Sequence, residues 1–223
     1  FTRPVAELRV GILTIREKWE RLLGLNASWH TQNYLRKKFP LNLNEYNWLI
    51  AGSLLPDDSL LSAISALKKG EALCFRGSML AAYNADGSGS LSPDDYSCVE
   101  YTKPFHRMNR LWDIFSLNGL ALEADFDELT KGRVSQIPDN SNKIMGTRFF
   151  MEEGAQLSCS IINTTSGAVY LAKDSEIWEG CMIRGGLALC QGSSLKMGAK
   201  IYGPTTVGPG SRVGGEVSNC VFQ

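Results

Sequence analysis

The chain has 223 residues, and its 23 lysines and arginines balance its 23 aspartates and glutamates, so the formal net charge is zero. A neutral chain lacks the clustered positive charge that broad binding to nucleic acid or an anionic membrane requires, and we expect neither partner. The six cysteines show no CxxC spacing, and no apolar run is long enough to cross a bilayer. We therefore expect a cytoplasmic protein with room for two domains.

The first predicted element is a helix that opens at Arg3-Pro4 and runs to Leu23. Apolar residues recur along it at helical spacing, and proline is favoured in a first helical turn. Gly24 follows where a helix commonly stops, because glycine adopts the left-handed backbone of a C-terminal cap without strain. These signals predict one continuous helix.

A strand, a loop and a second helix follow. Residues 48–51 form a short apolar run typical of a buried strand, which breaks at Gly52. Asp57, Asp58 and Ser59 are all candidate N-cap residues for the next helix. Because the loop of a strand–loop–helix unit commonly faces a ligand, Gly52 is a candidate nucleotide-binding residue, with a simple loop turn as the alternative. Residues 73–83 then predict one strand, and residues 125–129 the beginning of a short helix.

Residues 84–95 place oxygen-bearing side chains at positions 1, 3, 5, 9 and 12 of a calcium-loop pattern. Position 12 is Asp95 rather than glutamate, and the preceding residues predict a strand where an EF-hand needs a helix. We interpret the segment as a surface hairpin loop built from ordinary turn residues. His30 and His106 are isolated in the sequence, and we assign them no role.

Residues 138–143 are rich in Asn, Asp and Ser and are the best linker candidate. Beyond them an aliphatic residue recurs at every sixth position, eight times in succession. The eight residues are Leu171, Ile177, Ile183, Leu189, Leu195, Ile201, Val207 and Val213. A period of six fits neither a helix nor a flat half-buried strand, and it predicts a hexapeptide solenoid with three hexads in each triangular coil.

The solenoid places residues eighteen apart at equivalent corners of successive coils, about 4.8 Å from each other. Arg184 is therefore expected beneath Tyr202, and Trp178 beneath Lys196. Arg184, Lys196 and Lys200 are therefore predicted to form a basic strip that binds phosphate, because arginine suits bidentate phosphate contacts. The alternative is a set of solvated corners that keep the solenoid soluble.

Three stretches carry a resemblance to a known family: residues 1–19, which include Thr2-Arg3-Pro4-Val5-Ala6-Glu7-Leu8; residues 111–133, which include Trp112-Asp113-Ile114-Phe115, Asn118-Gly119 and Asp125-Phe126; and the hexads of residues 170–215. The chain resembles the alternative bacterial form of the bifunctional UDP-N-acetylglucosamine pyrophosphorylase/glucosamine-1-phosphate N-acetyltransferase family. The resemblance implies an α/β, Rossmann-like sugar nucleotidyltransferase domain over residues 1–145. A left-handed parallel β-helix of hexapeptide repeats would follow over residues 146–223.

The resemblance also implies two chemistries. A uridylyl- or thymidylyltransferase site would join a nucleoside triphosphate to a sugar 1-phosphate with Mg²⁺, and the β-helix would use acetyl-CoA to acylate an amino sugar phosphate between the subunits of a homotrimer. It makes Arg3 and Gly52 nucleotide- or phosphate-binding residues and Asp113 a metal ligand. The residues implied for sugar phosphate or CoA are Arg184, Lys196, Lys200 and Tyr202.

The chain departs from the family pattern at several places. Related enzymes have Gly-Asp for a metal ligand where this chain has Gly52-Ser53, so Asp57, Asp58 and Asp113 are the alternative ligands. The family's glycine-rich loop is expected before Phe1 and its acetyl-transfer histidine in a later coil, so we expect a fragment whose catalytic residues are unknown. Two alternative functions remain. The chain carries out acyl transfer alone, or it is a non-catalytic trimeric scaffold or regulatory subunit.

Overall fold

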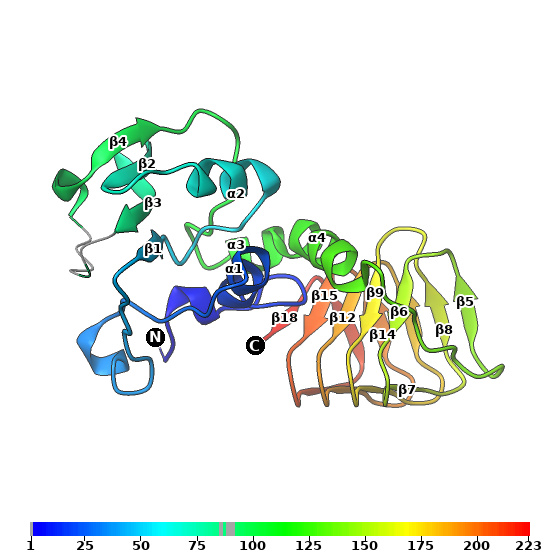
Figure 1. Cartoon of the computed structure of the whole chain (residues 1–223). Helices are drawn as coiled ribbons and strands as arrows, with labels where there is room; N and C mark the ends of the chain where they lie inside the picture. Colours follow the sequence, from blue (N-terminus) through cyan, green and yellow to red (C-terminus); the bar gives the residue numbers. More distant parts are fainter. Residues whose placement is uncertain (1, 85–86, 88–91) are drawn as a thin grey trace. The chain divides into compact units, whose positions relative to one another are not determined.

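The computed structural model describes residues 2–84, 87 and 92–223, and they form two compact units (Figure 1). The first unit comprises Phe1–Leu8 and Ile15–Asn109, and the second comprises Arg9–Thr14 and Arg110–Gln223. Residues 85–86 and 88–91, half of the segment in which the sequence matches a calcium pattern, lie outside the described residues.

A four-stranded mixed sheet in the order β1–β3–β2–β4 forms the centre of the first unit. Its strands are β1 (Asn47–Ile50), β2 (Glu71–Phe75), β3 (Ser78–Asn84) and β4 (Ser97–Glu100). β3 is antiparallel to both β1 and β2, whereas β2 and β4 are parallel. The prediction of one strand over residues 73–83 is therefore wrong. The chain reverses at Arg76 and Gly77, which both have positive φ (48° and 78°), as a tight hairpin turn requires.

The helices of the first unit are short. They are α1 (Ile15–Leu23), α2 (Asp58–Ser65) and the 3₁₀ helices η1 (Val5–Glu7), η2 (Asn33–Leu35) and η3 (Pro93–Asp95). α2 begins where the sequence predicts, because the Asp57 side chain accepts a hydrogen bond from the N–H of Leu60 at 2.9 Å. Gly24 ends α1 with a φ of 66°.

The single helix predicted from Pro4 to Leu23 is wrong. η1 and α1 are separated by an irregular turn over Arg9–Thr14, which belongs to the second unit. Gly11 in this turn has a φ of 85°, which a helix does not allow. The N–H groups of the turn are bound by side chains of a distant helix instead of by helical carbonyls.

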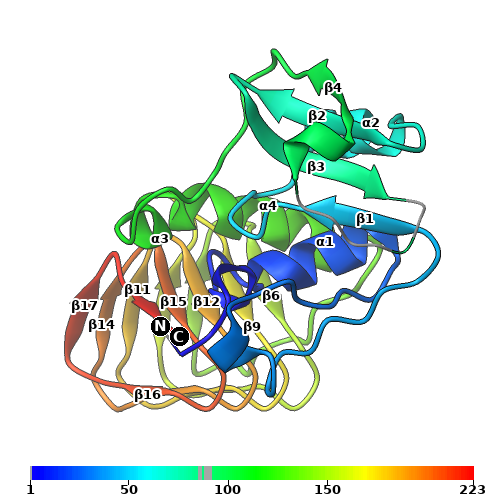
Figure 2. The same cartoon turned by 90° about the vertical axis from the view of Figure 1, so that its left-hand side faces the viewer.

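The second unit contains a parallel β-solenoid of about four turns over residues 143–222, which confirms the solenoid predicted from the period of six and is consistent with the left-handed β-helix that the resemblance implies (Figures 1 and 2). Its first face consists of β5 (Lys143–Met145), β8 (Ile161–Asn163), β11 (Met182–Arg184), β14 (Lys200–Tyr202) and β17 (Glu216–Ser218). The second face consists of β6 (Phe149–Met151), β9 (Val169–Leu171), β12 (Leu187–Leu189), β15 (Thr205–Val207) and β18 (Val221–Phe222). The third face consists of β7 (Gln156–Leu157), β10 (Glu176–Ile177), β13 (Ser194–Leu195) and β16 (Arg212–Val213).

The interior of the solenoid is lined by the residues of the six-residue period. All eight aliphatic side chains from Leu171 to Val213 are buried in one cluster. Successive coils also approach closely at three glycines. A Cβ atom on Gly167 or on Gly203 would overlap the backbone of Gly186 on the neighbouring coil. Only glycine allows the coils to stack at this corner.

Two helices precede the solenoid in the second unit, α3 (Asp113–Ser116) and α4 (Asn118–Thr130). Figure 1 shows α4 lying along the second face of the solenoid, over β9, β12 and β15. Leu122, Phe126 and Leu129 pack into one buried cluster with side chains of that face. The helical start predicted at residues 125–129 lies inside α4, which begins at Asn118.

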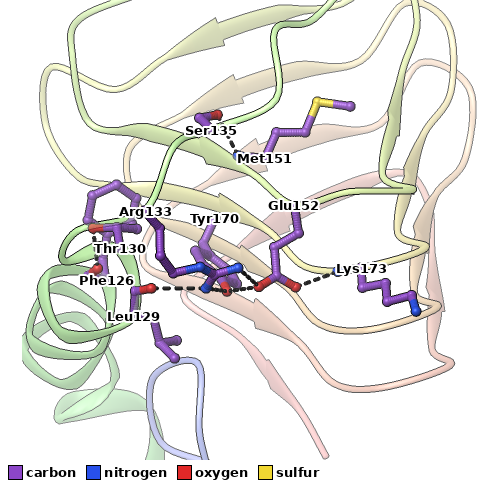
Figure 3. A network of polar contacts seen from close by, with 9 residues as sticks. All are labelled: Phe126, Leu129, Thr130, Arg133, Ser135, Met151, Glu152, Tyr170 and Lys173. Carbon is purple, nitrogen blue, oxygen red and sulfur yellow. Dashed lines mark hydrogen bonds and ion pairs between the residues drawn. The ribbon is translucent and has the colours of Figure 1, made fainter.

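A polar network joins the end of α4 to the second face (Figure 3). The carboxylate of Glu152 accepts hydrogen bonds from Arg133 Nη2 at 2.6 Å and from the Tyr170 hydroxyl at 2.7 Å. The N–H of Lys173 donates to the same carboxylate at 2.8 Å. Arg133 also donates to the carbonyl of Leu129, in the last turn of α4. The network thus fixes the helix end to the solenoid.

Candidate functional site

The loop between β1 and α2 packs against η1 in the first unit. Gly52 is exposed, and a Cβ atom at this position would approach the Cβ of Ala6 in η1 to 3.3 Å. Arg3 is exposed and lies just before η1 in the chain. The structure therefore places the loop that carries Gly52 beside the helix that follows Arg3.

The same loop is bound on another side by residues 106–108. The N–H of Leu55 donates to the carbonyl of His106 at 3.0 Å, and the N–H of Met108 donates to the carbonyl of Ser53 at 2.8 Å. Between these bonds, Arg107 Nε donates to the hydroxyl of Ser53 at 3.0 Å. Backbone and side-chain contacts thus hold a guanidinium group at the loop.

The environment of Arg107 differs from that of two other half-buried arginines, Arg16 and Arg148. Arg16 pairs with the carboxylates of Glu7 and Glu20, and Arg148 pairs with Glu123 and Asp127. Within residues 2–84, 87 and 92–223, Arg107 has no carboxylate partner. Its positive charge is oriented by a neutral hydroxyl and is not compensated by any described acid. A cation in this state is suited to an anionic ligand.

Two buried aromatic residues support the loop and α2. The indole N–H of Trp19 in α1 donates to the carbonyl of Leu54 at 2.8 Å. Tyr101 is buried, and burial together with the nearby Asp57 carboxylate raises the pKa of its hydroxyl. The Trp19 hydrogen bond therefore ties the loop to α1.

Sequence reasoning did not identify Arg107. It lies in an irregular segment, 54 residues from Ser53, and no motif around it signals that the two side chains meet. Only the antiparallel bridge between Leu54 and Arg107 brings them together. Such a contact depends on tertiary structure and has no local periodicity to reveal it.

The predicted metal ligand Asp113 lies in the second unit, at the start of α3. Its Oδ2 accepts a hydrogen bond from the N–H of Arg110 at 2.8 Å, as a carboxylate at a helix start commonly does. Nowhere in the described part of the chain do three His, Cys, Asp or Glu side chains gather as a metal site would need.

The loop itself does not fit a resident Mg²⁺ ion. The Ser53 hydroxyl accepts a hydrogen bond from a cation, and the Asp57 carboxylate caps α2. Mg²⁺ commonly binds one or two carboxylates together with substrate phosphates, and here Asp57 is engaged as the helix cap while Asp58 is exposed in the first turn of α2. We derive no step of the reaction through a metal held at this loop.

The residues predicted on the solenoid lie on adjacent coils. Arg184 is directly opposite Tyr202 in the register of β11 and β14, which confirms the spacing of eighteen. Lys200 and Tyr202 flank the buried Ile201, so all three polar side chains lie on the outer side of the first face. Lys196 follows β13 on the third face and precedes the corner that leads to β14. The structure thus brings three of the four residues onto one face, and the fourth lies across a corner.

Comparison with known proteins identifies the family. A family model described as sugar nucleotidyl transferase matches residues 1–134, and these include Arg3, the Gly52-Ser53 loop, Arg107 and Asp113. No curated protein matches the chain. Over the described residues, none of the helices combines the length and the apolar character that a membrane crossing demands. The chain belongs to the sugar nucleotidyl transferase family.

Proposed function

We propose that the chain takes part in nucleotide-sugar biosynthesis by joining a nucleoside triphosphate to a sugar 1-phosphate. A phosphate oxygen of the sugar 1-phosphate attacks the α-phosphorus of the nucleotide, the bond to the β-phosphate breaks, and pyrophosphate leaves. Transfer of this kind depends on positioning and on neutralising phosphate charge. The observation that carries the proposal is the family match over a loop where Gly52 packs against η1.

The residues that we propose for nucleotide and phosphate binding are Arg3 and Gly52. An exposed glycine lets a phosphate approach the backbone closely, and an arginine offers bidentate hydrogen bonds. Mg²⁺ is expected to enter with the nucleoside triphosphate and to neutralise its phosphates. The assignment of Asp113 as a metal ligand stays a prediction. The nucleotide is expected to be UTP or dTTP.

We propose acyl transfer from acetyl-CoA to an amino sugar phosphate as a second activity, carried out by the solenoid. The specific observation in its favour is the shared outer face of Arg184, Lys200 and Tyr202, with Lys196 at the next corner. Two cationic side chains on adjacent strands and a phenol suit a ligand that carries phosphate.

We also propose that the solenoid assembles into a homotrimer through its first face. Met182 and Tyr202 on this face are 53% and 42% exposed, and Met197 at the adjoining corner is 66% exposed. Large apolar side chains gathered on one face favour contact with another protein surface. Analytical ultracentrifugation of the chain tests this assembly directly.

The two reactions are tested separately. The chain is incubated with Mg²⁺, N-acetylglucosamine 1-phosphate and either UTP or dTTP, and pyrophosphate release is followed. In a second assay, acetyl-CoA and glucosamine 1-phosphate are supplied and free CoA is separated by chromatography. Pyrophosphate release supports nucleotidyl transfer. CoA release alone leaves the acyltransferase alternative, and inactivity in both assays favours the scaffold.

A further inference from the structure

The guanidinium group of Arg107 lies at the β1–α2 loop in a setting that suits the binding of an anion. Arg107 is half-buried, its Nε donates to the Ser53 hydroxyl, and the backbone on both sides of it is bonded to the loop. A side chain held this firmly loses little conformational freedom when a ligand binds. Burial without a carboxylate partner also leaves its charge less screened than a surface charge.

The loop beside Arg107 also carries an exposed glycine. Gly52, the neighbour of Ser53, has no side chain and is exposed, so the backbone beside the guanidinium is open to a bulky group. The loop contacts η1 through Ala6, and the chain enters η1 from Arg3. The Arg107 side chain thus contacts the loop at Ser53, and Arg3 precedes the 3₁₀ helix on which the loop packs.

We propose that Arg107 binds a phosphate group of the nucleotide or of the sugar phosphate, and that Ser53 is the positioning residue that orients its guanidinium group. The choice of ligand rests on the nucleotidyl transfer proposed above. Arginine supplies planar, paired N–H donors that match phosphate oxygens. A hydrogen bond from Nε to Ser53 fixes the plane in which the remaining donors lie. Charge neutralisation at this loop thus comes from a guanidinium group.

Calorimetric titration of the full chain tests the proposal. The probes are inorganic pyrophosphate, UTP and N-acetylglucosamine 1-phosphate, each with and without Mg²⁺. Arg107→Met is expected to weaken binding of at least one probe about tenfold or more, since a charge-assisted contact is lost. Arg107→Lys is expected to restore binding in part, because lysine keeps the positive charge but lacks the paired, planar N–H donors of arginine. The probe that responds most strongly identifies which phosphate Arg107 binds.

The control is Arg36→Met in the same unit. Arg36 is exposed, and its Nε also donates to an oxygen, the carbonyl of Thr31 at 3.2 Å. This variant is expected to bind all three probes as the unaltered chain does. Circular dichroism spectra of each variant establish that the fold is retained. Unchanged affinity of Arg107→Met for every probe, or no binding of any probe by the unaltered chain, overturns the proposal.

The role of Ser53 is separated from a general structural role by a double-mutant cycle. Ser53→Ala is expected to weaken binding in the unaltered chain and to have no further effect when Arg107 is already methionine. Ser53→Thr keeps the hydroxyl and is expected to restore affinity. Equal effects of Ser53→Ala in both backgrounds show that the serine does not act through Arg107.

The binding experiment also distinguishes this proposal from the proposed reaction. Arg107-dependent binding without pyrophosphate release supports the phosphate site and contradicts nucleotidyl transfer. Turnover that is unchanged in kcat and KM by Arg107→Met supports nucleotidyl transfer and contradicts the phosphate site.

Discussion

The carboxylate of Asp125 in α4 accepts a hydrogen bond from the backbone N–H of Ile12 at 2.7 Å, across 113 positions of sequence. The N–H of Leu13 donates to the same oxygen at 3.0 Å. Nearby, the side-chain oxygen of Asn118 accepts from the N–H of Gly11 at 2.7 Å. Two successive turns of α4 therefore supply the hydrogen-bond acceptors that a helix over residues 11–13 would otherwise have provided internally.

Asp125→Ala is expected to destabilise the second unit strongly. Asp125 is 5% exposed, and its loss leaves the buried N–H of Ile12 and the half-buried N–H of Leu13 without this acceptor. Each buried unsatisfied donor costs roughly 1–3 kcal/mol, so we expect a loss of about 2–4 kcal/mol. Guanidinium unfolding followed by circular dichroism measures the change. Asp127→Ala on the same helix is the control, because the Asp127 side chain is largely exposed; an equal loss there contradicts the role given to Asp125.

The Glu152 network makes stability depend on pH. Burial alone raises the pKa of Glu152, but hydrogen bonds from Tyr170, Arg133 and the Lys173 N–H outweigh it and hold the pKa below the ordinary value of 4.5. A lowered pKa stabilises the folded state above pH 4.5, and this stability is lost as the pH falls through the lowered value. Unfolding measured from pH 6 to pH 2 should show the loss.

Glu152→Gln should remove this part of the acid dependence, because glutamine does not titrate. Glu153→Gln is the matched control, since Glu153 is the exposed neighbour of Glu152. The same pH profile in Glu152→Gln and in the unaltered chain would show that other acids govern acid unfolding.

The glycine contacts between coils predict a steric effect. In Gly203→Ala the new methyl group overlaps the backbone of Gly186, which has no side chain that can move aside. Overpacking of this kind costs about 1–3 kcal/mol. In Gly214→Ala the new Cβ meets only the side chain of Lys196, at 3.3 Å, and a smaller loss is expected. Thermal unfolding compares the two variants, and equal melting temperatures would contradict the close approach at Gly203.

The cysteines of the first unit should react at very different rates. Burial, together with neighbouring Cys98 and Glu100, raises the pKa of Cys74 to about 11, so little thiolate forms below that pH. Cys98 is exposed on the parallel neighbour β4. With an aromatic disulfide at pH 8, we expect Cys98→Ser to reduce the fast phase of labelling and Cys74→Ser to leave it unchanged. Loss of fast labelling in Cys74→Ser contradicts this order.

The solenoid could be predicted from sequence because its pattern is local and repeated. Each inward aliphatic from Leu171 to Val213 is buried as the period of six requires, and the register of Arg184 with Tyr202 follows from the same count. The first helix could not be predicted, because Asp125 and Asn118 redirect the backbone of residues 11–13 from far along the chain. Helical spacing of apolar residues continues through the turn and conceals it.

The candidate site was predictable only where a motif marks it. Gly52 follows an apolar strand and precedes a capped helix, which is a recognisable pattern. Arg107 has no such marker, since its meeting with Ser53 depends on an isolated bridge between irregular segments. The sequence does not reveal the hairpin turn at Arg76-Gly77 either, because an arginine seldom takes positive φ.

The second unit is discontinuous in sequence, since it includes Arg9–Thr14 as well as Arg110–Gln223. The backbone therefore passes from one unit to the other three times. Ile12 from the short segment lies in the buried cluster formed by α4 and the second face. A gene cut at residue 110 would yield a solenoid piece that lacks part of its own core. Shuffling of domains between genes would therefore have to move both units together, so the two halves are expected to be inherited as one piece.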